Sequence, residues 1–229
     1  MSLERATLFV GSARPTGEST SETLGRYLVD RLEGAGAKAS IHRASHARKG
    51  TAERELMASL DDSDLFVLST PLYVDSLPYL VTDALERIVA RREFRGPDRP
   101  TGLLAIVNCG FPEADHTATA IDICRAFARR AGYAWRGGLG LGGGELIAGR
   151  PLDEVGWPAR HAREALDLAA KALFEGRRVP ERAIELMARP MIPHRLYTLV
   201  GDMRWRRTAR RHGVGRRLDH RPYESPLEG

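Results

Sequence analysis

Short apolar runs alternate with longer segments of helical periodicity through most of this chain. The first run, Ala6–Val10, contains strand-forming residues, and a segment with Leu24, Leu28 and Leu32 at helical spacing follows it. The predicted strands cover residues 6–10, 37–41, 65–69, 102–107 and 133–141. Strands that alternate with helices form a parallel sheet covered on both faces. The sequence therefore predicts an α/β fold with a doubly wound five-stranded parallel sheet.

The intervening helices are predicted from apolar spacing and from the residues that bound them. The first follows Ser19–Ser21 and ends at Gly34, and Pro78 is compatible with the first turn of the third. The later helices are predicted over residues 52–60, 77–88, 117–130 and 158–174. We expect residues 1–176 to form one domain, because 229 residues suffice for one well-filled core. Residues 177–229 are expected to form a basic C-terminal helical extension.

Charge and cysteine content exclude several classes of protein. Residues 190–229 carry nine arginines against four carboxylates, which accounts for the formal net charge of +5. Cys109 and Cys124 cannot build a disulfide framework, and no Cys/His cluster suggests a metal site. No apolar run approaches the roughly 20 residues of a spanning helix, and the start of the chain does not resemble a signal peptide. A cytoplasmic protein is expected.

The loop after the first predicted strand is rich in groups that bind anions. It lacks the Gly-x-x-x-x-Gly-Lys-Ser/Thr of a P-loop and the Gly-x-Gly-x-x-Gly of a dinucleotide site. Hydroxyls, one guanidinium and the free amides of a helix start predict a site for a monophosphate. The residues concerned are Ser12, Arg14, Ser19, Thr20 and Ser21. The alternative is that Ser19 or Thr20 only caps the helix, and the two roles are compatible.

The loops after the third and fourth predicted strands suit a planar heterocycle. Pro71, Leu72, Tyr73 and Val74 combine apolar and aromatic side chains with a stiff backbone. An isolated tyrosine is more commonly an ordinary half-buried one, but the pairing with the first loop favours ring binding for Tyr73. The fourth loop, residues 108–112, can place Asn108, Gly110 and Phe111 along the polar edge of the same ring. A nucleophilic Cys109 is disfavoured because no neighbouring His or Lys would lower its pKa.

These motifs together resemble the NAD(P)H-dependent FMN reductase and flavodoxin-like NAD(P)H oxidoreductase family. The resemblance rests on Gly-Ser-x-Arg, Thr-Pro-Leu-Tyr-Val-Asp-Ser-Leu-Pro and Asn-x-Gly-Phe, and it covers about residues 6 to 150. It implies a flavodoxin-like fold in which Ser12, Arg14 and Ser19–Ser21 hold the FMN phosphate. Residues 71–74 would contact the isoalloxazine, with Asn108, Gly110 and Phe111 at its edge.

The resemblance implies an enzyme whose chemistry belongs to its cofactor. NADH or NADPH would deliver hydride to flavin N5, and the electrons would pass to a quinone, a nitro or azo compound, or another small-molecule acceptor. No catalytic side chain and no metal are expected. A non-enzymatic FMN electron carrier of flavodoxin type is the alternative, and a domain that has lost its flavin is a third. A homodimer is expected by analogy.

Two further segments have open interpretations. The glycine-rich run at residues 137–144 either borders the flavin or a partner subunit, or forms a mobile surface loop. A helix is predicted over 191–211, with apolar residues on one side and arginines elsewhere. Its apolar side is expected to pack on the domain or across a dimer. Contact with a membrane surface is an alternative, and no nucleic-acid motif is recognised.

Overall fold

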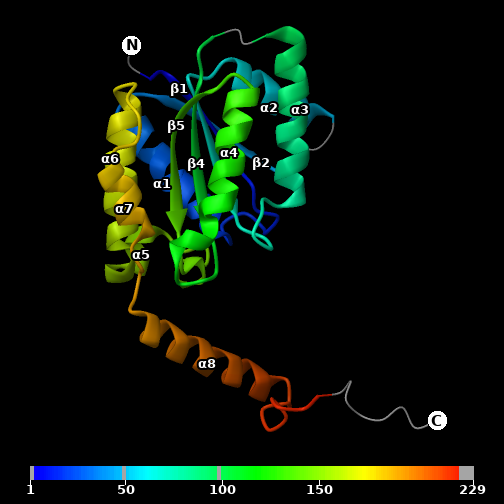
Figure 1. Ribbon diagram of the computed structural model, residues 1–229, viewed down its shortest axis with the longest axis vertical. Helices are drawn as coiled ribbons and strands as arrows, with labels where there is room; N and C mark the ends of the chain where they lie inside the picture. The colour runs from blue at the N-terminus through cyan, green and yellow to red at the C-terminus, as the bar shows by residue number, and fades with distance from the viewer. Residues whose placement is uncertain (1–2, 48–49, 97–98, 222–229) are drawn as a thin grey trace, which may run out of the picture. The chain divides into compact units, whose positions relative to one another are not determined.

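Five parallel strands lie in the order β2-β1-β3-β4-β5 in the computed structural model, which describes residues 3–47, 50–96 and 99–221 (Figure 1). They are β1 (Arg5–Val10), β2 (Lys38–Arg43), β3 (Leu65–Pro71), β4 (Gly102–Asn108) and β5 (Ala134–Leu141). This strand order defines the flavodoxin-like doubly wound fold. The predicted fold class is confirmed, and each strand lies within two residues of its predicted bounds.

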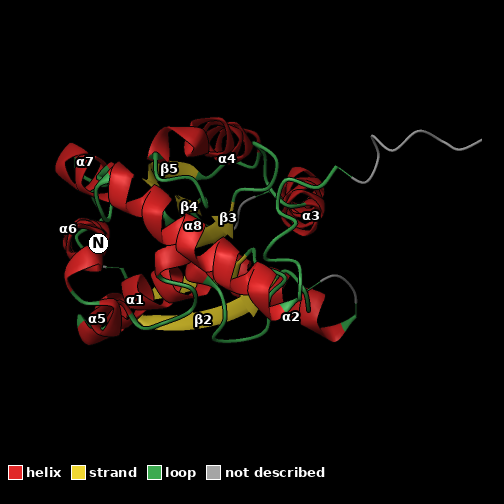
Figure 2. Cartoon of the chain, turned by 90° about the horizontal axis from the view of Figure 1, so that it is seen from below, coloured by secondary structure: helices red, strands yellow, loops and turns green. Residues whose placement is uncertain are grey.

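Helices cover both faces of the sheet (Figures 1 and 2). One face carries α1 (Thr20–Gly34), α6 (Arg160–Phe174) and α7 (Glu181–Ala188), with the short α5 (Leu152–Val155) at its edge. The other face carries α2 (Thr51–Asp61), α3 (Tyr79–Arg95) and α4 (Ala118–Arg130). The sheet is thus the middle layer of three.

The core is split by the sheet into two apolar clusters. Leu8 and Val10 of β1 pack toward α1 and α6, whereas Phe9 between them packs toward α2 and α3. This alternation follows from the two-residue repeat of a strand. Because both faces are covered, successive residues are all buried, which explains the continuous apolar runs in the sequence.

The largest departure from the predicted helix bounds is at the end of α3, which runs to Arg95 instead of residue 88. α3 begins at Tyr79, two residues later than predicted, because Pro78 has the extended ψ of 146° and precedes the helix. α4 and α6 begin one and two residues later than predicted, directly after short 3-10 turns at Ala114–Thr117 and Trp157–Ala159. α7, which follows Pro180, was not predicted. Its apolar residues recur at helical spacing, a signal that could have revealed it.

The chain divides into two compact units, residues 1–191 and 192–229. The boundary expected after residue 176 falls inside the first unit, because α7 packs against α6 and β5. In the second unit, α8 (His194–Arg211) occupies most of the helix predicted over 191–211 and starts after Pro193. Taken by itself, α8 exposes its apolar residues Leu196, Leu199, Val200, Met203 and Trp205. None of the helices in the described residues has the length and apolar character needed to cross a bilayer.

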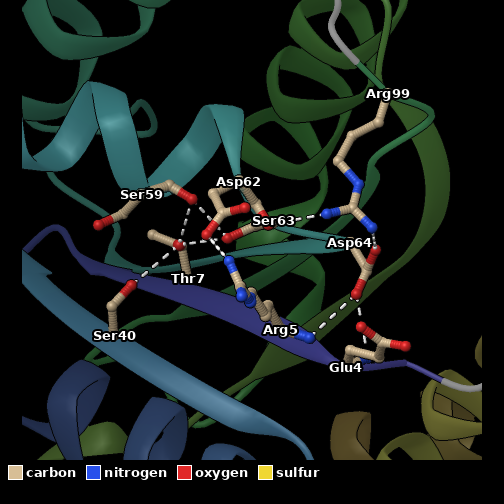
Figure 3. A network of polar contacts seen from close by, with 9 residues as sticks. All are labelled: Glu4, Arg5, Thr7, Ser40, Ser59, Asp62, Ser63, Asp64 and Arg99. Atoms are coloured by element: carbon tan, nitrogen blue, oxygen red, sulfur yellow. Dashed lines mark hydrogen bonds and ion pairs between the residues drawn. The ribbon is translucent and has the colours of Figure 1, made fainter.

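A polar network ties together the amino ends of the strands (Figure 3). The Asp64 carboxylate accepts the backbone N–H groups of Glu4 and Arg5, both at 2.9 Å, and pairs with Arg99 at 2.5 Å. Nearby, the buried Thr7 hydroxyl contacts Ser63 Oγ at 2.5 Å. These contacts fix the start of β1 against the start of β3. The network lies at the edge of the sheet opposite to the strand ends that precede the predicted binding loops.

Candidate functional site

The carboxyl ends of four strands meet at one edge of the sheet. Parallel pairing aligns Val10 with Ser69, Pro71 with Asn108, and Asn108 with Leu141. The loops that leave β1, β3, β4 and β5 are therefore neighbours, and this is the edge where doubly wound folds bind ligands. They surround a pocket with about 460 Å³ of free space, which includes its open mouth.

Ten of the twelve predicted binding residues line this one pocket. They are Ser12, Arg14, Ser19, Thr20, Ser21, Pro71, Leu72, Tyr73, Asn108 and Gly110. Three lining residues were not predicted as binding residues: Cys109, Gly144 and Glu145. Two of these, Gly144 and Glu145, belong to the loop after β5, which the sequence marked only by its glycines. The three loops predicted to act together are thus brought together, while contact with a flavin stays a prediction.

Val74 and Phe111 do not line the pocket. Val74 is 97% exposed and lies with Asp75 at the tip of a tight turn, where Tyr73 and Ser76 exchange backbone hydrogen bonds of 2.9 and 3.1 Å. Both tip residues have positive φ, 48° and 57°, so the turn holds a strained backbone. Phe111 is 53% exposed and stacks on the His116 ring with a centroid distance of 4.4 Å. These contacts direct both side chains elsewhere.

Ser12 and Ser19 keep a hydroxyl proton for a ligand. The Ser12 hydroxyl accepts the Arg14 N–H at 3.2 Å, and the Ser19 hydroxyl caps α1 by accepting the Glu22 N–H at 3.1 Å. Within the described part of the chain, neither hydroxyl donates to another protein group. Both side chains are buried in the pocket wall. Each O–H is therefore available to an anion at the positive end of α1.

The hydroxyls of Thr20 and Ser21, which were expected to bind a phosphate, donate hydrogen bonds to other parts of the protein. Thr20 donates to the Gly144 carbonyl at 2.7 Å, and Ser21 donates to Asn108 Oδ1 at 2.7 Å. Both bonds are buried and connect α1 to the loops after β4 and β5. Among the described residues, however, the backbone amides of Thr20 and Ser21 have no acceptor, as is usual for the first turn of a helix. These two residues can contact an anion through their amides.

Arg14 supplies a positive side chain to the wall of the pocket. Its guanidinium lies 3.5 Å from the Glu145 carboxylate, and both side chains are about half exposed. A pair this exposed contributes little to stability. An anion in the pocket can therefore take the place of Glu145 as the partner of Arg14 at small cost. Less polar residues also line the pocket, namely Pro71, Leu72 and the half-exposed Tyr73.

The glycine-rich run leads into the loop after β5, which is the fourth loop that lines the pocket. Gly137, Gly138 and Gly140 lie inside β5, and residues 142–144 are buried, so the expected alternative of a mobile surface loop is wrong. Gly143 donates to the Phe111 carbonyl at 2.6 Å, and Gly144 donates to the Cys109 carbonyl at 2.8 Å. The loop after β5 is thereby fastened to the loop after β4. Gly144 lines the pocket, while contact of the run with a flavin or a partner subunit stays a prediction.

The thiols of both cysteines are unsuited to nucleophilic chemistry. Burial raises the pKa of Cys109, whose thiol lies 3.5 Å from the Glu113 carbonyl and 3.6 Å from the Phe111 carbonyl. Burial raises the pKa of Cys124 to about 12. A thiol reacts as its thiolate, which such environments disfavour. This agrees with the expectation that neither cysteine is catalytic.

No family model and no curated protein matches the chain, but solved structures do. One is an NAD(P)H:quinone oxidoreductase from Methanothermobacter marburgensis, 15% identical, with a TM-score of 0.55 over 76% of this chain and 96% of that one. Another is an FMN-dependent NADH-azoreductase from Bacillus anthracis in complex with FMN, 13% identical, with a TM-score of 0.52 over 75% and 100% of the chains. RosB with bound 8-demethyl-8-formylriboflavin-5'-phosphate is 13% identical, with a TM-score of 0.55 over 88% and 86%.

These neighbours share the flavodoxin-like fold with this chain. The names of the first two describe enzymes of the kind that the sequence motifs resemble, and two of the three structures hold a flavin phosphate. At identities of 13 to 15%, the likeness establishes the fold. Function has to be argued from the site.

Proposed function

We propose that the protein is an FMN-dependent NAD(P)H oxidoreductase. The observation that carries the proposal is one pocket that combines anion-binding groups with less polar residues, built by loops that are far apart in the sequence. The anion-binding groups belong to Ser12, Ser19, Arg14 and the start of α1, and the less polar residues are Pro71–Tyr73. FMN needs both kinds of contact, because it carries a phosphate and a planar ring. The names of the structural neighbours support this assignment.

The residues present can bind each part of FMN. Two hydroxyl protons, the amides of Thr20 and Ser21 and the Arg14 guanidinium are donors for a phosphate. The Asn108 Oδ1 atom is fixed by Ser21, so its amide nitrogen is left to donate toward the ring edge. Gly110 has open space where a side chain would lie, so the backbone there can approach a ring closely.

The protein's contribution to the reaction is orientation and electrostatics. When bound, FMN supplies a centre that accepts hydride from NAD(P)H and passes the electrons on. The loop after β3 presents Tyr73, which is 48% exposed, beside the pocket. No side chain is assigned as a general acid or base. The quinone and azo substrates named for the neighbours make a quinone or azo compound the acceptor to test first.

Flavin binding and reduction test the function directly. We expect the protein to bind FMN in a 1:1 complex, and the flavin absorbance to bleach within the dead time of manual mixing when NADH or NADPH is added without oxygen. Rapid bleaching followed by reoxidation with a quinone supports the enzyme. Slow bleaching that needs an added reductase supports an electron carrier instead. A protein that binds no FMN contradicts both.

Replacing Arg14 by alanine should weaken FMN binding by about 1.5 to 3 kcal/mol, which is the usual contribution of a charge-assisted contact. The change removes the guanidinium from the proposed phosphate site but leaves the buried hydroxyls in place. Titration of flavin fluorescence measures the dissociation constant of each variant.

Riboflavin, which lacks the phosphate, is the matched ligand. Its affinity should be the same for the wild-type protein and the Arg14→Ala variant. Lys38→Ala is the matched protein control, because Lys38 is an exposed cation at the amino end of β2, away from the pocket. Equal FMN affinities for wild type and Arg14→Ala would remove Arg14 from the phosphate site.

A further inference from the structure

A buried ion pair lies beside the loop that joins β1 to α1. Glu22 Oε2 is 2.6 Å from Arg43 Nη1, and the two side chains are 2% and 9% exposed. Buried pairs of this kind contribute little net stability, because the loss of hydration offsets their attraction. Stability alone therefore does not explain why a carboxylate and a guanidinium are buried here.

Both members of the pair hold the backbone of that loop. The Glu22 carboxylate accepts the Gly17 N–H at 2.8 Å, and Arg43 Nη2 donates to the Arg14 carbonyl at 2.7 Å. Neither Glu22 nor Arg43 lines the pocket. The pair therefore fixes two points of the loop from outside the site, on either side of the turn between Arg14 and Gly17.

We propose that Glu22 and Arg43 are positioning residues, which hold the loop between β1 and α1 in its phosphate-binding conformation before the phosphate arrives. This inference rests on the proposed function. A loop that is already ordered loses less conformational entropy when a ligand binds, so its affinity is higher. The Glu22 and Arg43 side chains act through the loop backbone, not by touching the flavin.

Positive side chains around Glu22 offset its negative charge, so that the carboxylate does not repel an anion in the pocket. Its other oxygen accepts from Arg26 Nε at 2.9 Å, so two guanidinium groups face one carboxylate. Burial disfavours the ionised form, but Arg43, the Gly17 amide and Arg26 outweigh burial and hold the pKa of Glu22 below its usual value. The carboxylate is thus ionised at neutral pH, with a net positive charge around it.

The Glu22→Gln variant separates positioning from general stability. A glutamine amide matches glutamate in size, but its NH₂ group faces donors, so at least one contact to Arg43, Arg26 or Gly17 is lost. We expect the FMN dissociation constant to rise roughly tenfold, the usual effect of losing one charged hydrogen bond. The riboflavin dissociation constant should not change, because riboflavin has no phosphate for the loop to hold.

Asp64→Asn is the matched control. Asp64 also accepts backbone N–H groups and pairs with an arginine, but it does so at the opposite edge of the sheet (Figure 3). We expect this variant to lose stability to a similar degree, while its ratio of FMN to riboflavin affinity equals that of the wild-type protein. If Glu22→Gln lost affinity for FMN and for riboflavin to the same extent, Glu22 would have a structural role only and the proposal would be overturned.

Two further measurements test the proposal if the Glu22→Gln variant does not fold. Arg43→Lys keeps the charge, but one ammonium group cannot replace the two nitrogens that contact Glu22 and Arg14. It should therefore show the same selective loss of FMN affinity. In the flavin-free wild-type protein, the Gly17 amide should be protected from hydrogen exchange, because a buried carboxylate accepts it.

The outcomes distinguish this inference from the proposed function. Rapid exchange at Gly17, or normal FMN affinity in both variants, would overturn the positioning role while FMN binding by the wild-type protein stands. A wild-type protein that binds no FMN would overturn the proposed function, and the positioning role with it.

Discussion

Replacing Gly142 by alanine is expected to lower the free energy of unfolding by about 2 to 4 kcal/mol and to weaken FMN binding more than tenfold. A β-carbon at this position would lie 2.2 Å from the Pro112 carbonyl oxygen and 2.7 Å from its carbonyl carbon. These are backbone atoms, so the loops after β4 and β5 must separate. Their separation breaks the hydrogen bonds from Gly143 and Gly144, and with them one wall of the pocket.

Urea unfolding followed by circular dichroism measures the stability of this variant, and flavin titration measures its affinity. The control is Gly34→Ala at the last position of α1, where a β-carbon has no neighbour within 4 Å. That change should stabilise the protein by about 0.5 to 1 kcal/mol and leave FMN affinity unaltered. A Gly142→Ala variant as stable as the wild-type protein would show that the two loops do not pack as described.

Replacing Phe66 by alanine is expected to cost about 3 to 5 kcal/mol of stability while the folded protein keeps its FMN affinity. Phe66 is fully buried in β3, and its ring contacts Phe127 and Tyr133 at centroid distances of 6.4 and 5.6 Å. The loss leaves a cavity in the aromatic cluster on the face covered by α4. Phe66 pairs with Thr7 and Leu103, toward the amino ends of the strands, whereas the pocket lies at the carboxyl ends.

Phe94→Ala is the matched control, because Phe94 on α3 is 91% exposed. Its loss should change the free energy of unfolding by no more than about 0.5 kcal/mol. Together with Gly142→Ala, these variants separate two effects. The Phe66→Ala substitution should lower stability alone, and the Gly142→Ala substitution should lower both stability and FMN affinity. A large loss of FMN affinity in Phe66→Ala, measured well below its unfolding midpoint, would contradict this separation.

The fold could be predicted from local patterns because the spacing of apolar residues within short segments indicates whether each segment is a strand or a helix. The run Gly102–Val107 is apolar throughout and can only be a buried strand in such a chain, and Leu24, Leu28 and Leu32 fall on one helix face. α7 was missed because eight residues give a weak periodic signal. Its place in the first unit depends on α6 and β5, which local patterns do not reveal.

The site was predicted at the level of loops and less well at the level of contacts. Strand ends identify the loops, so the residues after β1, β3 and β4 were found. Val74 was misplaced because a tight turn with positive φ points it outward, and no rule for a Val-Asp pair predicts such a turn. The hydroxyls of Thr20 and Ser21 could not be assigned, since their partners Gly144 and Asn108 are 124 and 87 residues away.

Local patterns along the chain were enough to predict a five-stranded doubly wound sheet with polar and apolar loops at the carboxyl ends of its strands. Periodicity and loop chemistry are local, and local order suffices for that conclusion. Three features became visible only in the folded protein: which hydroxyls lack an acceptor among the described residues, the part of the loop after β5 in the pocket, and the pairing of Glu22 with Arg43 beside the first loop. Those contacts depend on how the helices pack on the sheet, because this packing brings together side chains that are far apart in the sequence.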